Sequence, residues 1–283
     1  MPDFDASTQS RQLAQLILDA CLPCLAAHRL PFVLGLSGLQ GSGKSTLARA
    51  LTLCARRIGF QAQRLSLDDV YFGHRARKRL AASVHPLLAT RGVPGTHDTT
   101  LLLHTLDAMQ RASPRHPARL PRFDKGRDTR RSTSHWPRVT QVPDLLVLEG
   151  WCLGLDAQAP EELREPINTL ESGADPDGRW RRHVNDALVA MQTVWQRLDR
   201  LVVLAAPDWE TACRWRARAE AALRARHATR AMSPAQLRRF MMHFERLSRH
   251  ALRTLPAQAD LCLDLDQRHR LRRVRTRTRN AEG

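Results

Sequence analysis

The sequence predicts an α/β fold in which a mostly parallel β-sheet lies between two layers of helices, with a helical lid above it. Short apolar runs that suit buried strands recur at 32–36, 62–67, 144–150, 201–204 and 261–265. Segments with helical spacing of their apolar residues separate several of these runs. Because strands that alternate with helices favour βαβ units, we expect a three-layer α/β/α architecture.

The first predicted strand leads into a glycine-rich turn that satisfies the phosphate-loop (P-loop) pattern G-x-x-x-x-G-K-[ST]. Glycine lets the backbone approach a phosphate with its N–H groups pointing inward, and a helix that starts at the turn adds its dipole. The stretch therefore predicts a P-loop NTPase fold with a nucleoside triphosphate site. The residues expected to hold the phosphates are Gly38, Gly41, Ser42, Gly43, Lys44, Ser45 and Thr46.

Acidic residues follow two of the predicted strands. Lys44 can reach the β- and γ-phosphates, and Ser45 can place its hydroxyl on Mg²⁺. After the second strand come Asp68 and Asp69, one suited to accept a proton from a substrate hydroxyl and the other to hold Mg²⁺ through water. The alternative is a pair of turn aspartates that cap a helix. Glu149 ends the 144–150 strand, where an acid normally approaches the metal.

The segment from His85 to Asp98 is a loop by composition and holds polar groups able to bind a small anion. Arg91, His97 and Asp98 are the candidates. A helical stripe begins just after this loop, so Thr96 or Asp98 can equally serve as a helix N-cap.

Residues 111–143 are rich in proline, arginine and serine and lack apolar periodicity. A long insertion of this kind is either a substrate-binding loop or a disordered segment. Lys125 is one of only three lysines in the chain, which favours a selected ammonium group, and Asp124 stands next to it. We include both among the candidate substrate residues.

The predicted helix over 209–226 carries several arginines. In an enzyme that transfers a phosphoryl group, such a helix can act as a lid that brings a guanidinium group to the γ-phosphate. Arg216 and Arg218 are the candidates. For most of these arginines the alternative is a solvated helix face with i,i+4 ion pairs.

The net charge of +17 comes almost entirely from arginine, which is densest between Arg268 and Arg279. We expect a solvated basic tail there, or non-specific binding of polyanions by that tail. No apolar run approaches the roughly 20 residues that a membrane helix needs. The six cysteines do not form a disulfide or zinc pattern, so we expect a reduced, cytoplasmic protein.

With these residues identified, the chain resembles the D-glycerate 3-kinase family of P-loop kinases, the plant-type glycerate kinases and their microbial relatives. The motifs that carry the resemblance are PLLATRGVPGTHD (Pro86–Asp98), PRFDKGRD (Pro121–Asp128) and VLEGWCLG (Val147–Gly154). SLDDVY resembles, more distantly, the post-strand motif of uridine kinases, pantothenate kinases and phosphoribulokinases, which places the base on Asp68.

The resemblance implies ATP- and Mg²⁺-dependent phosphorylation of D-glycerate to 3-phosphoglycerate. The apolar spacing over residues 8–22 predicts a helix that ends at Pro23. We therefore divide the chain into a leading helix (1–30), a P-loop kinase domain (31–267) with substrate-loop insertions near 72–98, 111–143 and 155–180, and a basic tail (268–283). Two alternatives stay open: a kinase of the same fold that acts on a nucleoside, pantothenate or a sugar phosphate, and an RNA-binding ATPase. Aromatic residues total only 5% of the chain, which favours a small polar acid over a nucleoside.

Overall fold

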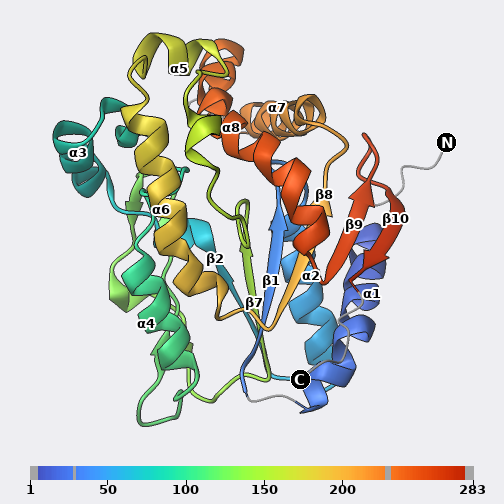
Figure 1. The fold of residues 1–283 in the computed structure, drawn as a ribbon. Coiled ribbons are helices and arrows are strands. Elements are labelled where there is room, and N and C mark those ends of the chain that lie inside the picture. Colours follow the sequence, from blue (N-terminus) through green and yellow to red (C-terminus); the bar gives the residue numbers. More distant parts are fainter. Residues whose placement is uncertain (1–5, 28–29, 227–230, 278–283) are drawn as a thin grey trace.

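A six-stranded sheet forms the centre of the computed structural model, which describes residues 6–27, 30–226 and 231–277. The strand order is β10-β9-β8-β1-β7-β2 (Figure 1). Five strands run parallel, and β10 pairs with β9 in the antiparallel direction. The strands are β1 (Phe32–Gly38), β2 (Ala62–Ser66), β7 (Leu145–Gly150), β8 (Arg200–Ala205), β9 (Leu261–Leu265) and β10 (Leu271–Thr276). The predicted α/β fold with a mostly parallel sheet is confirmed.

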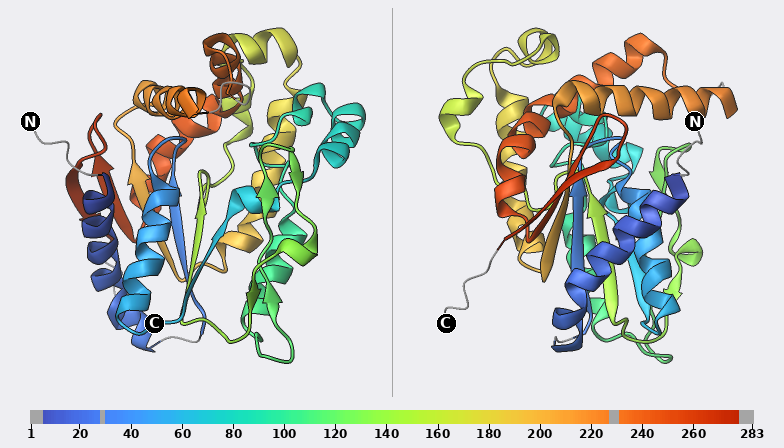
Figure 2. Two further views of the ribbon diagram at one scale, coloured as in Figure 1. Left: turned by 180° about the vertical axis from the view of Figure 1, so that it is seen from behind. Right: turned by 90° about the vertical axis from the view of Figure 1, so that its right-hand side faces the viewer.

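Helices cover both faces of the sheet, so every residue of β1 and of β7 is buried. On one face lie α1 (Ala6–Ala27) and α2 (Lys44–Arg57); on the other lie α6 (Arg179–Trp195) and α8 (Pro234–Gln258) (Figures 1 and 2). Helix α7 (Trp209–Arg226) crosses above the carboxyl ends of the strands (Figure 1).

The remaining elements are short. They are α3 (His74–Ser83), α4 (Thr99–Met109), α5 (Thr169–Ala174), the 3-10 helices η1 (Leu67–Val70), η2 (Pro86–Ala89), η3 (Thr133–His135) and η4 (Pro160–Leu163), and the small strands β3 (Ala118–Arg119), β4 (Phe123–Asp124), β5 (Thr129–Arg130) and β6 (Arg138–Val139). The 111–143 insertion is therefore ordered as two small hairpins, in which β3 pairs with β6 and β4 pairs with β5.

The strand register brings the carboxyl ends of the central strands to one level. Ser37 of β1 lies opposite Gly150 of β7, and Ser66 of β2 lies opposite Glu149 of β7. In an open parallel sheet, ligands bind at this edge. The register therefore places the P-loop after β1 beside the acid that ends β7.

Helix α1 is longer than the sequence pattern predicts. We expected the helix to end at Pro23, but it continues to Ala27 with the proline inside it. A proline in a helix removes one backbone hydrogen bond. Cys21 and Leu25, on either side of Pro23, are both buried in the core, and their packing keeps this part of the chain helical.

The prediction that 261–265 is the last strand, followed only by a basic tail, is wrong. Residues 271–276 form β10 on the edge of the sheet. The Asp266 side chain accepts the backbone N–H groups of Arg268 and Arg270, which fixes the turn between the two strands. An edge strand has one free side, so its arginines can remain in solvent. Residues 278–283 lie outside the described residues.

None of the helices in the described ranges combines the length and the apolar character that crossing a bilayer requires.

A buried ion pair joins α8 to α5 above the sheet. The Arg246 guanidinium donates to both Glu171 carboxylate oxygens, at 2.9 and 2.6 Å, and to the backbone carbonyls of Glu162 and Glu165. Both side chains of the pair are buried. Four of the five guanidinium N–H groups thus have acceptors, and these bonds hold together α8, α5 and the segment that runs from η4 to α5.

Replacing Arg246 with alanine should lower the free energy of unfolding by about 3–5 kcal/mol, because the Glu171 carboxylate would stay buried without a partner. Denaturant unfolding followed by circular dichroism measures the change. The matched control is Arg249→Ala on the same helix, since Arg249 pairs with Glu210 and Glu245 at the exposed surface; its loss should cost about 1 kcal/mol or less. Equal losses in the two variants would contradict the prediction.

Candidate active site

The P-loop leaves β1 at its carboxyl end and runs into the start of α2. Gly41 and Gly43 have φ values of 81° and 88°, which L side chains rarely adopt. A Cβ on Gly41 would lie 2.8 Å from the backbone nitrogen of Arg216 in α7, so only glycine lets the lid helix pack this closely. Ser42 Oγ and the Gln40 side-chain amide are buried without hydrogen-bond partners among the described residues. The loop thus holds unsatisfied polar groups, as a phosphate site requires.

Ser45 and Glu149 meet at the edge of the sheet. Ser45 Oγ donates to Glu149 Oε1 at 2.8 Å, and the glutamate is 5% exposed. A hydroxyl and a carboxylate in contact beside a phosphate loop fit Mg²⁺ bound to ATP. Among the described residues no group of three or more His, Cys, Asp or Glu side chains could hold a metal ion, so Mg²⁺ here would depend on nucleotide oxygens as well.

Asp68, on η1 after β2, receives hydrogen bonds on both carboxylate oxygens. Lys125 Nζ donates to Oδ2 at 2.6 Å, and the Tyr71 hydroxyl donates to Oδ1 at 2.8 Å. Burial acts to raise the pKa of Asp68, but the charges of Lys125 and Lys44 and these two hydrogen bonds outweigh it and hold that pKa well below its ordinary value. Asp68 is therefore ionised and free to accept a proton, although its lowered pKa makes it a weaker base than an ordinary aspartate.

A cleft of about 300 Å³ brings together eight of the seventeen predicted site residues. Lining it are Gly41, Lys44, Ser45, Asp68, Arg91, Lys125, Glu149 and Arg216. Arg91 forms an ion pair with Asp128, and Arg216 pairs with Glu220 at 2.6 Å. The P-loop, the ends of β2 and β7, the β4–β5 hairpin and α7 thus contribute side chains to one cleft.

Three of the predicted site residues are occupied by structural contacts elsewhere. Asp69 accepts the Phe123 backbone N–H at 3.1 Å and pairs with Arg122 at 3.2 Å. Asp98 caps α4 by accepting the Leu101 N–H, which confirms the capping alternative. Asp124 accepts two backbone N–H groups of the turn that follows it. None of the three lines the cleft. Their positions favour roles in shaping the loops that surround the site.

His97 and Arg218 also lie outside the cleft lining. The His97 ring is buried and stacks on Tyr71 with 4.5 Å between ring centroids, and burial lowers its pKa to about 4. A neutral imidazole in this place supports the tyrosine that donates to Asp68. Arg218 is exposed on α7, so of the two lid candidates only Arg216 reaches the cleft.

The sequence did not indicate two further features of the site: His269, which contacts the P-loop, and an apolar wall in the cleft. His269, in the turn between β9 and β10, donates from Nε2 to the Gly41 carbonyl at 2.8 Å. Its ring stacks on Trp215 of α7, with centroids 4.1 Å apart, and Trp215 in turn donates to the Gln267 carbonyl. His269 is 228 residues from Gly41, so no local pattern could have revealed the contact. An apolar wall of Trp151, Phe240 and Phe244 in the cleft was likewise missed.

The site defines a P-loop kinase for small molecules. Its defining features are a mostly parallel sheet with a P-loop, a serine–glutamate pair at the edge of the sheet and an ionised aspartate across the cleft.

No protein-family model matches the chain. The chain is 34% identical over 228 residues to the "Uncharacterized kinase mug58" of Schizosaccharomyces pombe, covering 76% of this chain and 78% of that protein. It is 29% identical over 245 residues to the chloroplastic D-glycerate 3-kinase of Arabidopsis thaliana, covering 84% of this chain and 51% of that protein.

The solved structure of a D-glycerate 3-kinase from Cryptococcus neoformans superposes with a TM-score of 0.79 at 22% identity, over 94% of this chain and 99% of that chain. This likeness supports the fold. The chain belongs to the same family of P-loop kinases as the Schizosaccharomyces pombe protein, and D-glycerate 3-kinases are distant relatives of it, as the motifs predicted.

Replacing His269 with alanine should weaken ATP binding about 2- to 12-fold, since the Gly41 carbonyl loses one hydrogen bond that holds the P-loop in place. Isothermal titration calorimetry gives the Kd. His269→Phe keeps a ring against Trp215 but cannot donate, so it should show the same weakening. Unchanged affinity in both variants would remove His269 from the site.

Proposed function

We propose that this protein transfers the γ-phosphoryl group of ATP to a hydroxyl of D-glycerate and gives 3-phosphoglycerate. The observation that carries the proposal is the ionised Asp68 carboxylate, which lies in the same cleft as the P-loop and is flanked by the cations Arg91 and Lys125. The names of two relatives support the choice of D-glycerate. The family and the fold alone would fit other hydroxyl acceptors.

In the proposed reaction the P-loop and Lys44 hold the triphosphate. Mg²⁺, held by Ser45 and Glu149 when bound, would neutralise charge on the phosphate oxygens. Asp68 accepts the hydroxyl proton as the hydroxyl oxygen attacks the γ-phosphorus, and ADP leaves. Arg216 faces the cleft from α7 and stabilises the charge that develops on the transferred group.

The substrate carboxylate has two cationic partners on the side of the cleft away from the sheet. Lys125 and Arg91 both line the cleft, and Arg91 NH2 lies 3.5 Å from the Lys125 carbonyl. Lys125 is the more exposed of the two, with 62% of its side chain accessible against 29% for Arg91. A small acid must obtain its affinity from such charged contacts because it has little apolar surface to bury.

A second candidate is a kinase for a larger hydroxy acid such as pantothenate. Composition favoured a small acceptor, but Trp151, Phe240 and Phe244 concentrate aromatic surface in the cleft. An acceptor with an apolar part could pack on this wall while its carboxylate contacts Lys125. A panel of D-glycerate, L-glycerate, pantothenate, uridine and ribulose 5-phosphate, each assayed for ADP release, decides between the candidates; D-glycerate should give the highest kcat/KM.

Changing Asp68 to asparagine should lower kcat by about 10²–10⁴-fold, because the amide cannot accept the hydroxyl proton. The Kd for ATP should stay within about threefold, since that carboxylate is not assigned to the nucleotide. Stopped or coupled assays of ADP release give kcat, and calorimetry gives the Kd. The matched control is Asp69→Asn, whose side chain lies outside the cleft lining. Undiminished turnover in the Asp68 variant would assign the base to another group.

Lys125→Met should raise the KM for D-glycerate about 10- to 150-fold, through loss of one charge-assisted contact to the carboxylate. The KM for ATP should change far less. Lys78→Met serves as the control, because Lys78 is an exposed lysine on α3 that does not line the cleft. If the two variants showed the same KM for D-glycerate, Lys125 would have no part in substrate binding.

A further inference from the structure

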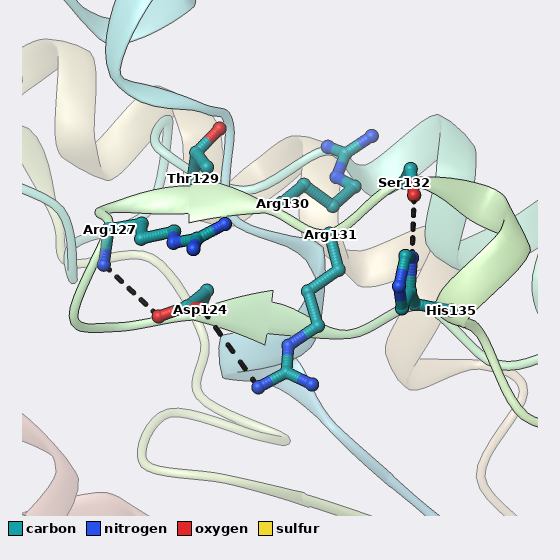
Figure 3. Close-up of a pocket in the computed structure, with 7 residues that line it drawn as sticks. All are labelled: Asp124, Arg127, Thr129, Arg130, Arg131, Ser132 and His135. Atoms are coloured by element: carbon teal, nitrogen blue, oxygen red, sulfur yellow. Dashed lines mark hydrogen bonds and ion pairs between the residues drawn. The ribbon is translucent and has the colours of Figure 1, made fainter.

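A second cavity, apart from the active-site cleft, lies at the β4–β5 hairpin. This cavity measures about 470 Å³ (Figure 3). Its walls consist of three arginines, His135, the hydroxyl groups of Thr129 and Ser132, and one carboxylate, Asp124. It shares no lining residue with the active-site cleft. The hairpin therefore separates two polar cavities.

The charges around this cavity are not balanced by the protein. Arg130 is neutralised by Asp98 at 3.0 Å, whereas its Nε is buried without a partner. Arg131 reaches Asp124 only at 3.9 Å. Arg127 forms no ion pair within the ranges that the structure describes. Asp124 is the only carboxylate in the lining, and its Oδ1 is already engaged by backbone N–H groups.

The three arginines concentrate positive charge around the cavity, and an anion bound there would offset it. In Figure 3 the Arg127 side chain extends between β4 and β5. The side chains of Arg131 and His135 lie beyond its tip. Ser132 Oγ and His135 Nδ1 are 2.8 Å apart, so a hydroxyl and a ring nitrogen are held at its rim. Guanidinium forks combined with hydroxyl groups are suited to a tetrahedral oxyanion.

We propose that this cavity is a second anion site that binds a phosphate group, either inorganic phosphate or the phosphate of a small monoester. The cavity is open to solvent on one side and is lined by a single short segment, residues 124–135, which favours a small ligand over a long polyanion. The same hairpin carries Lys125 and Asp128, which contact Asp68 and Arg91. A ligand in this cavity would therefore contact the same hairpin that carries Lys125, a proposed substrate contact.

The test uses the full chain saturated with Mg²⁺ and a non-hydrolysable ATP analogue, so that the P-loop is occupied. Calorimetric titration with inorganic phosphate should show saturable binding at one site. The double variant Arg127→Ala and Arg131→Ala should weaken this binding about tenfold or more. A control double variant, Arg49→Ala and Arg57→Ala, removes the same charge from the exposed surface of α2 and should leave phosphate binding unchanged.

Three results would overturn the proposal. The wild-type chain could fail to bind phosphate, or both double variants could weaken binding equally. Alternatively, Lys125→Met could abolish binding while the hairpin variant, Arg127→Ala with Arg131→Ala, binds phosphate as the wild type does. The last result would place phosphate in the active-site cleft. Thermal unfolding of each variant checks that the hairpin variant is folded, and the single variants Arg127→Ala and Arg131→Ala replace it if it is not.

Titration with glycerol 3-phosphate then distinguishes the two ligand sources. A lower Kd for glycerol 3-phosphate than for inorganic phosphate assigns the site to a monoester, and a higher Kd assigns it to the free ion.

Discussion

The site depends on the register of the parallel strands. Leu36 of β1 and Ser66 of β2 both lie opposite Glu149 of β7. A slip of one residue in β7 would turn the Glu149 side chain to the other face of the sheet, because neighbouring residues in a strand point in opposite directions. The contact between Glu149 and Ser45, and with it the fit for Mg²⁺, would then be lost. Because helices cover both faces of these strands, a slipped strand would have to repack its side chains against the opposite helix layer, and this cost opposes the slip.

Above that edge the polar loops set the electrostatics of the cleft. Tyr71 is packed between the His97 ring and the Phe123 ring, and its hydroxyl reaches Asp68 from this packed position. Lys125 reaches the same carboxylate from the β4–β5 hairpin. The partners of Asp68 are thus supplied by separate loops, and each loop has its own buried anchor. This arrangement keeps the carboxylate ionised despite its burial.

The sequence predicted what depends on local spacing: five of the six strands of the central sheet, the P-loop, the acid at the end of β7 and the helix that carries Arg216. Spacing alone could not decide between the neighbours Asp68 and Asp69, and only the resemblance of SLDDVY to other kinases favoured Asp68 as the base. In the structure the turn of η1 sends the two side chains to different partners. Contacts between distant segments were also out of reach. His269 meets Gly41 across 228 residues, and its place in an arginine-rich run suggested a solvated tail instead of a turn between two strands.

The contact between α7 and the P-loop explains how a lid arginine can be positioned before any ligand is bound. Gly41 has no side chain, so the α7 backbone at Arg216 packs directly on the loop. Glu220, one helical turn later and 2% exposed, pairs with the Arg216 guanidinium and restricts its motion. The Arg216 guanidinium is therefore held facing the cleft before a triphosphate binds. Such preorganisation lowers the ordering cost that a flexible arginine would incur when the transition state forms.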